Sequence, residues 1–170
     1  MEVFQAVASK RDERRYAPGR ELAPELVERI LDAGRLAGSA RNRQPWRFVV
    51  LEGSDNLVAL AEAVFEPKNV TSAGLIVAIV TAGGKGALDV GRAAQNMMLT
   101  AWGEGVLSTP NGIADGERAA AALGRPDGDE PVIVISFGYP QKPRNPAART
   151  AEEWSQRADR KPLDEIVERR

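Results

Sequence analysis

The segment K-R-D-E-R-R-Y at positions 10–16 places basic side chains at the end of an expected helix. Lys10 and Arg11 could hold a phosphate there, because a guanidinium group matches two phosphate oxygens at once. Cations also complement the dipole at a helix C-terminus. The segment therefore predicts either an anion site or a solvated helix end.

A second candidate is the polar connection S-A-R-N-R-Q-P-W at positions 39–46, which joins an expected amphipathic helix to an apolar strand. Its Ser, Asn and Gln side chains can hydrogen-bond to a ligand, and Pro45 with Trp46 then fixes the exit of the chain. Connections that carry several polar groups on a rigid scaffold are common binding sites. An ordinary turn anchored by Trp46 is the alternative interpretation.

Three further segments carry polar groups whose simplest interpretation is structural. T-P-N-G-I at 109–113 has the composition of a turn. E-P-K-N at 66–69 is a short polar stretch, and R-K-P-L-D-E-I-V at 160–167 is a charge run before an expected terminal helix. Each gains a functional interpretation only together with the two segments above.

The composition narrows the chemistry that the chain can perform. Its 170 residues suit one domain, and they include neither histidine nor cysteine. This excludes thiolate nucleophiles and serine–histidine triads, and we expect no metal site. An enzyme made from this chain needs carboxylates, lysine, tyrosine or a cofactor that brings its own chemistry. The net charge of −1 gives no global attraction to nucleic acid.

No stretch of the sequence is typical of a membrane span or a signal peptide. The longest apolar run, Leu75–Ala82, has the length of a strand. The first residues, M-E-V-F-Q-A-V-A-S-K-R, lack a basic leader before an apolar core. We therefore expect a cytoplasmic protein without membrane contact.

Hydrophobic periodicity predicts helices that outnumber short, buried strands. Apolar residues on both faces make 75–81 a central strand that is covered on each side. The result is one α+β domain over residues 1–170, with a sheet flanked by helices. The other expected elements are helices at 24–34, 54–64, 88–102 and 115–124 and strands at 47–51 and 132–137.

The two ends of the chain are also expected to be helical. A short helix at 2–9 should turn Val3, Phe4 and Val7 inward. Residues 139–170 should form an extended C-terminal arm and a terminal helix, which a capping box at Thr150 and Glu153 begins.

In their order along the chain, these polar segments resemble the motifs of the nitroreductase family. The first resembles its basic motif R-R-[S/D]-x-R-x-[F/Y], the second its signature S-x-x-N-x-Q-P-W, and the last its R-K-P-L motif. The family usually has proline where this chain has Gly38, which predicts a more flexible loop. The resemblance spans residues 11–167 and implies a three-layer homodimer, with a central mixed β-sheet and FMN at the subunit interface.

The resemblance assigns one cofactor to residues far apart in the chain. Basic residues from both ends would hold the FMN phosphate, Asp12 would meet the ribityl hydroxyls, and backbone N–H groups of Asn111 and Gly112 would face flavin N5. Arg14 would stabilise negative charge at the flavin N1/O2 edge as the one catalytic side chain. Ser39 and Asn42 would line the flavin and reach it from the partner subunit. The complete set of expected cofactor contacts is Lys10, Arg11, Asp12, Arg14, Ser39, Asn42, Gln44, Lys68, Asn69, Asn111, Gly112, Arg160 and Lys161.

The activity implied by the resemblance is FMN-dependent NAD(P)H oxidoreduction by a ping-pong route. NADH or NADPH would deliver hydride to flavin N5, and a nitroaromatic, quinone or similar small-molecule acceptor would take the electrons. Two alternatives stay open. One is a flavin-binding or sequestering protein without turnover, and the other is a relative that performs reductive dehalogenation or flavin fragmentation.

Overall fold

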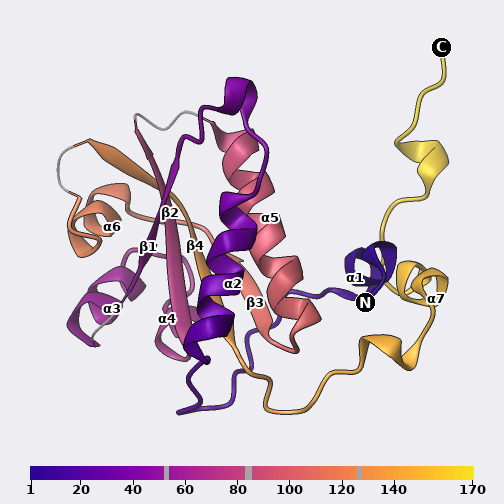
Figure 1. The fold of residues 1–170 in the computed structure, drawn as a ribbon, viewed down its shortest axis with the longest axis horizontal. Coiled ribbons are helices and arrows are strands. Elements are labelled where there is room, and N and C mark those ends of the chain that lie inside the picture. Colours follow the sequence, from indigo (N-terminus) through magenta and orange to yellow (C-terminus); the bar gives the residue numbers. More distant parts are fainter. Residues whose placement is uncertain (52–53, 83–85, 126–127) are drawn as a thin grey trace.

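A four-stranded sheet forms the centre of the fold in the computed structural model, which describes residues 1–51, 54–82, 86–125 and 128–170 (Figure 1). The strands follow the order β1-β2-β4-β3 across the sheet. They are β1 (Trp46–Val50), β2 (Leu75–Ala82), β3 (Leu107–Asn111) and β4 (Asp129–Gly138).

Every pairing between these described strands is antiparallel. The expectation of a mixed sheet is therefore wrong for this part of the chain, where a parallel contact occurs as an isolated bridge between Asp12 and Ser108. Fully apolar strands are typical of parallel sheets. They arise equally in antiparallel sheets that are covered on both faces, so the apolar pattern could not distinguish the two.

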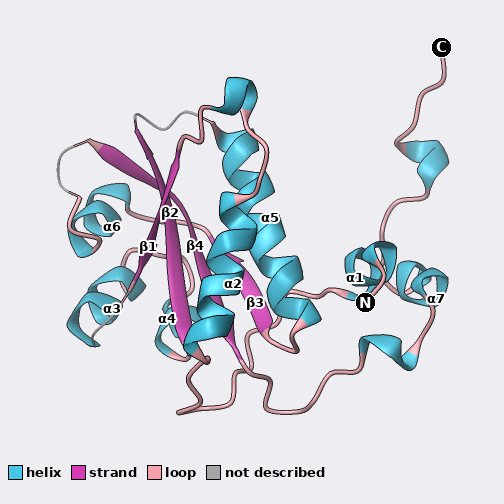
Figure 2. Ribbon diagram, viewed as in Figure 1, coloured by secondary structure: helices cyan, strands magenta, loops and turns pink. Residues whose placement is uncertain are grey.

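Helices cover both faces of the sheet, which makes three layers (Figure 2). One core cluster joins the sheet to α2 (Pro24–Arg35) and α5 (Ala87–Gly103) through residues such as Ile30 and Met97. The other face packs against three shorter helices. These are α3 (Ser54–Ala61), α4 (Pro67–Thr71) and α6 (Gly116–Ala122).

The central position of β2 confirms the prediction made from its apolar pattern. Ile76, Ala78 and Val80 enter one core cluster, while Val77 and Ile79 enter the other. Successive side chains of a strand point to opposite faces, so β2 contributes to both layers. The expected α+β architecture is confirmed.

The strand β3 was not expected. Its residues, L-S-T-P-N, have the composition of a turn, yet Leu107–Asn111 pairs along Val134–Gly138 of β4. The strand lies at an edge of the described sheet, where Pro110 interrupts no ladder on its outer side. This placement matters because β3 carries several of the predicted site residues or their neighbours.

The N-terminal helix α1 (Val3–Ser9) lies beside α7 (Ala151–Gln156), away from the sheet (Figure 1). The amide of Gln5 donates to the carbonyl oxygens of Pro146 and Arg149, at 2.6 and 3.0 Å, and so ties α1 to the C-terminal arm. The predicted capping box of Thr150 and Glu153 is confirmed at the start of α7. Beyond it, the arm carries a single 3-10 turn, Leu163–Glu165.

The prediction that α1 buries its apolar face is wrong for a single chain. Val3, Phe4 and Val7 are exposed, and the buried residues of the helix are Ala8 and Ser9. Periodicity identifies an apolar face but does not identify what covers it. No helix in the described part of the chain has both the length and the hydropathy of a membrane span.

Candidate functional site

The strand β3 aligns the basic N-terminal segment with the sheet. Asp12 forms its bridge to Ser108, and the N–H of Glu13 donates to the Ser108 carbonyl at 3.4 Å. The Thr109 hydroxyl donates to the carbonyl of Glu13 at 2.7 Å. Asp12 and Glu13 are therefore held along the edge of β3, although they belong to no strand themselves.

The end of β3 also meets α4 through two buried amides. Asn69 donates from Nδ2 to the Oδ1 of Asn111 at 2.9 Å. The Nδ2 of Asn111 donates in turn to the Ser136 hydroxyl at 2.8 Å. The side chain of Asn111 is thus committed to the interior, while Lys68, next to Asn69, is exposed.

Gly112 follows at the surface. Its carbonyl accepts the N–H of Phe65 at 3.2 Å. A Cβ added at this position would lie 3.1 Å from the Cδ2 atom of Phe65, so glycine suits the close approach. Together, β3 brings the predicted residues of the 10–14, 68–69 and 111–112 segments to one side of the fold.

Arg11 keeps donors for a ligand even though it has partners in the chain. Its Nη1 donates to the carbonyls of Ala8 and Lys10, at 2.7 and 2.8 Å, and its Nη2 to that of Trp154 at 3.1 Å. A guanidinium group has five N–H donors, so Nε–H and one Nη2–H remain. The guanidinium carbon also lies 5.5 Å from the ring centroid of Trp154, so Arg11 packs against α7.

The two neighbouring cations differ in their surroundings. Lys10 has a shielded side chain that forms an ion pair with Asp12 and lies 3.7 Å from the sulfur of Met98 on α5. Arg14 is exposed, and among the described residues it has no hydrogen bond or ion pair. Arg14 therefore has more freedom to meet a ligand than Lys10 or Arg11.

Tyr16 is close to this cluster but is not a candidate base. Burial, the dominant cause, raises the pKa of its phenol to about 12, although hydrogen bonding to Thr109 and the charge of Arg14 act in the opposite direction. Its hydroxyl donates to the Ser136 carbonyl at 3.3 Å. The phenol is therefore protonated and structural near neutral pH.

The polar connection at 39–46 has an unusual backbone. Arg41, Asn42 and Gln44 have positive φ angles of 52°, 55° and 47°. Non-glycine residues in this region cost free energy and tend to occur at functional sites. The Ser39 hydroxyl accepts the N–H of Gln44 at 2.9 Å, which closes the loop, and the side chains of Asn42 and Gln44 are exposed.

This loop lies at the opposite end of α5 from the basic segment (Figure 1). The N–H of Ala40 contacts Asp89 in the first turn of α5, whereas Lys10 contacts Met98. Asp89 and Met98 are nine positions apart, about 14 Å along the helix axis. Within one chain, these predicted site residues therefore form two separate groups. One is the loop at 39–46, and the other, the β3 group, contains the predicted residues of the 10–14, 68–69 and 111–112 segments.

Arg160 and Lys161 do not join either group within the chain. Both are exposed in the arm that follows α7 and projects from the body (Figure 1). Arg160 donates from Nη1 to the carbonyl of Ala158 at 3.0 Å. The described contacts do not connect these residues to Arg11, so the expected convergence of the two ends is not formed by one chain alone.

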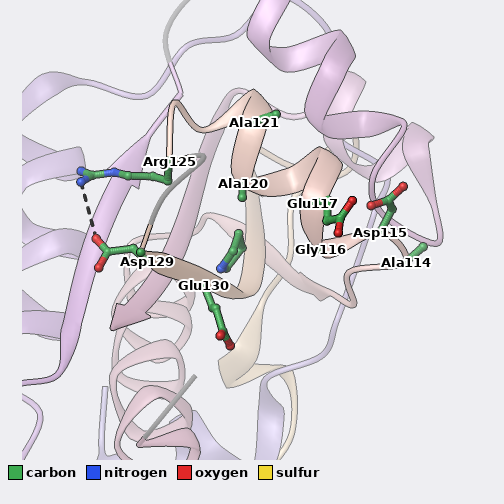
Figure 3. Close-up of a pocket in the computed structure, with 11 residues that line it drawn as sticks. Ala114, Asp115, Gly116, Glu117, Ala120, Ala121, Arg125, Asp129 and Glu130 are labelled. Atoms are coloured by element: carbon green, nitrogen blue, oxygen red, sulfur yellow. Dashed lines mark hydrogen bonds and ion pairs between the residues drawn. The ribbon is translucent and has the colours of Figure 1, made fainter. Parts of the chain in front are cut away.

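An open cavity of about 910 Å³ lies elsewhere, between α6 and the start of β4 (Figure 3). None of the predicted site residues lines it. Arg125 and Asp129 at its rim are 3.5 Å apart, and Asp129 is also 3.3 Å from Arg47. Further acidic side chains, Glu117 and Glu130, give the lining an excess of negative charge, which does not suit a phosphate.

The sequence of this chain is similar to the sequences of known proteins. The model of the nitroreductase family matches residues 7–85 and 82–139 of this chain. Two archaeal proteins, each provisionally named NADH dehydrogenase/NAD(P)H nitroreductase, are similar in sequence. The one from Archaeoglobus fulgidus is 30% identical over 152 residues, covering 82% of this chain and 86% of the relative. The one from Methanothermobacter thermautotrophicus is 29% identical over 161 residues, covering 88% and 82%.

Solved structures have the same fold. A nitroreductase family protein from Clostridium difficile 630 superposes with a TM-score of 0.82 at 25% identity, covering 99% of this chain and 98% of that one. An FMN-dependent nitroreductase from Clostridium difficile R20291 gives a TM-score of 0.78 at 20% identity, covering 93% and 98%. At 20% identity, the similarity to this second structure shows a shared fold and no more.

Proposed function

Because this chain belongs to the nitroreductase family, we propose that it is an FMN-dependent NAD(P)H oxidoreductase that acts as a homodimer. The names of the two archaeal relatives support a nicotinamide donor, and the name of one solved structure supports FMN. The observation that carries the proposal is the division of the site residues between the two ends of α5. A second copy of the chain can bring a loop to each β3 group.

The donor set fits the chemistry of FMN. Arg11 retains two N–H donors, and Lys10 lies beside it, so this end suits a phosphate. Asp12 can accept hydrogen bonds from ribityl hydroxyls. Arg14 and Lys68 are exposed cations near the end of β3 and suit the electron-rich pyrimidine edge of the ring.

The remaining contacts follow the same division. The backbone at Asn111 and Gly112 would face flavin N5, and Asn69 would hold Asn111 in place through its amide. Ser39, Asn42 and Gln44 would approach from the partner subunit. Arg160 and Lys161 would reach a phosphate through their exposed arm.

FMN held by these residues would supply the redox chemistry for hydride transfer from NADH or NADPH and for electron transfer to a nitroaromatic, quinone or similar acceptor. Arg14 would stabilise the negative charge that develops at the N1/O2 edge. Gly112 would offer a backbone N–H without a side chain in the way. The chain itself needs no nucleophile, which agrees with the absence of histidine and cysteine.

Exposed apolar side chains support the homodimer. Val3 of α1, Leu36 after α2 and Leu88 of α5 are 76%, 65% and 78% exposed. Two open grooves of about 600 and 590 Å³ lie along α5, one beside Val3 and Leu36 and the other beside Leu36 and Leu88. Contiguous exposed apolar surface of this kind is typical of subunit interfaces.

We also propose the cytoplasm as the location of the enzyme.

The test is anaerobic addition of NADH or NADPH to the purified protein loaded with FMN. Rapid bleaching of the yellow colour supports the oxidoreductase. A flavin that binds but stays oxidised supports the binding or sequestering alternative. A colourless protein that ignores added FMN overturns both. Halide release from a halogenated acceptor, or loss of intact flavin in air, would identify the dehalogenating or flavin-fragmenting alternative.

A further inference from the structure

Asp89 is a shielded carboxylate whose closest hydrogen-bond partner lies outside its own helix. The side chain is 12% exposed, and Oδ2 accepts the N–H of Ala40 at 3.3 Å. Its other oxygen, Oδ1, lies 4.0 Å from Nη1 of Arg92. The helix dipole favours an acidic residue in the first turn of α5. That explanation accounts for the charge but not for the contact with the loop.

Gly86, which caps the start of α5, and Arg92 within α5 also pack against this segment. A Cβ added to Gly86 would lie 2.8 Å from the Cγ of Pro45, and a Cβ added to Gly38 would lie 2.4 Å from Nη2 of Arg92. Gly86, Asp89 and Arg92 are spaced by three residues, so they share one side of the helix start. This surface therefore contacts Gly38, just before the loop, and then Ala40 and Pro45.

The loop needs such contacts because its backbone is strained. The left-handed conformations of Arg41, Asn42 and Gln44 persist only where the surroundings determine them. Hydrogen bonds to Ser39, from Gln44 N–H to Oγ and from Asn42 N–H to the carbonyl, close the loop on itself. Those bonds fix its shape but not its position relative to α5.

We propose that Asp89 is a positioning residue that fixes the 39–44 loop, so that Ser39 and Asn42 present their polar groups to the flavin of the partner subunit. The inference rests on the proposed function for the identity of that ligand. Asp89 does not touch the cofactor itself. It acts through the N–H of Ala40, which lies between Ser39 and Asn42 in the chain.

Three variants test this role. Asp89→Ala removes the acceptor, while Asp89→Asn keeps an oxygen that can accept the Ala40 N–H. Asp129→Ala is the matched control, because it removes a carboxylate of similar exposure, 13%, that pairs with arginines and does not contact the loop. FMN affinity is measured by quenching of flavin fluorescence, and hydrogen exchange is measured on peptides that cover 39–45.

Asp89→Ala should raise the Kd for FMN roughly 10-fold and speed exchange in the loop, because a hydrogen bond to a charged group is lost. Asp89→Asn should stay within about 3-fold of the wild type. Asp129→Ala should change neither quantity. Wild-type affinity in Asp89→Ala, or equal weakening in Asp129→Ala, would overturn the inference and leave the proposed function intact. A wild-type protein that binds no FMN overturns the proposed function, and loop exchange then still decides whether Asp89 holds the loop.

Discussion

The Nδ2 group of Asn69 lies 2.9 Å from the Oδ1 of Asn111, and both side chains are buried. The pair joins the short helix α4 to the last residue of the edge strand β3. Exposed Lys68 and exposed Gly112 flank it on the two segments. A buried polar pair thus sets the relative position of two surface residues that are proposed to meet the cofactor.

Substitution of Asn69 by alanine should destabilise the fold. The Oδ1 of Asn111 would lose its donor inside the protein, which costs about 1–3 kcal/mol of the free energy of unfolding. Chemical denaturation measures the loss. Lys68→Ala, an exposed neighbour, should stay within about 0.5 kcal/mol of the wild type. Equal stability of the two variants would contradict the structural role of the pair.

Arg11→Ala should weaken FMN binding through the phosphate. Loss of a charge-assisted contact should raise the Kd roughly 10-fold or more at low salt. Riboflavin, which lacks the phosphate, provides the control. If Arg11→Ala weakens riboflavin as strongly as FMN, the effect comes from the contacts of Arg11 with Ala8 and Trp154 and not from a phosphate site.

Arg14→Ala should slow flavin reduction by NADH or NADPH more than it weakens FMN binding. The rate should fall at least about 10-fold, because the cation acts on charge that develops during the reaction. Anaerobic stopped-flow absorbance gives the rate, and a flavin titration gives the affinity. Arg15→Ala, an exposed neighbour, is the matched control. Normal reduction by the Arg14 variant with simple loss of FMN would remove the assigned role.

Leu88→Glu should dissociate the homodimer and release FMN in parallel. A charge introduced in an apolar interface loses its hydration when the subunits associate. Sedimentation velocity reports the assembly state, and absorbance at the flavin band reports occupancy. Val58→Glu places the same change on α3, where the side chain is 53% exposed on the other side of the sheet. A dimer that survives Leu88→Glu, or fails with Val58→Glu, contradicts the proposed interface.

Tyr16 should make the fold sensitive to alkali. Burial raises its pKa to about 12, above the ordinary value of 10.0, so the unfolded chain loses the phenol proton first. Its contribution is present below pH 10 and is lost as pH rises toward 12, by roughly 2 kcal/mol. Urea unfolding of the wild type and Tyr16→Phe between pH 9 and 11 measures the difference. Parallel pH dependence in both proteins would contradict it.

Local patterns predicted the elements whose signals lie within a few residues. The capping box at Thr150 and the continuous apolar run of β2 were sufficient for their elements, because each signal is contained in the element that it predicts. The burial of β2 between two layers also followed, since a strand that is apolar on both faces needs a covering layer on each face.

Other features depend on partners that are distant in sequence. Pro110 and Asn111 have turn composition, yet pairing with β4 makes them a strand. The side chain of Asn111 points inward because Asn69 and Ser136 satisfy it there. Asp89 had no motif to identify it, since its role depends on the N–H of a residue 49 positions away. No local pattern contains these contacts.

The division of the site residues along α5 has a genetic consequence. If each site takes its loop from one subunit and its β3 group from the other, Arg11→Ala and Asn42→Ala lesions belong to different halves of a site. A mixed dimer of the two variants then contains one site with both lesions and one with none. Two inactive alleles of this chain would complement each other when they are expressed together, which a site contained in one subunit does not allow.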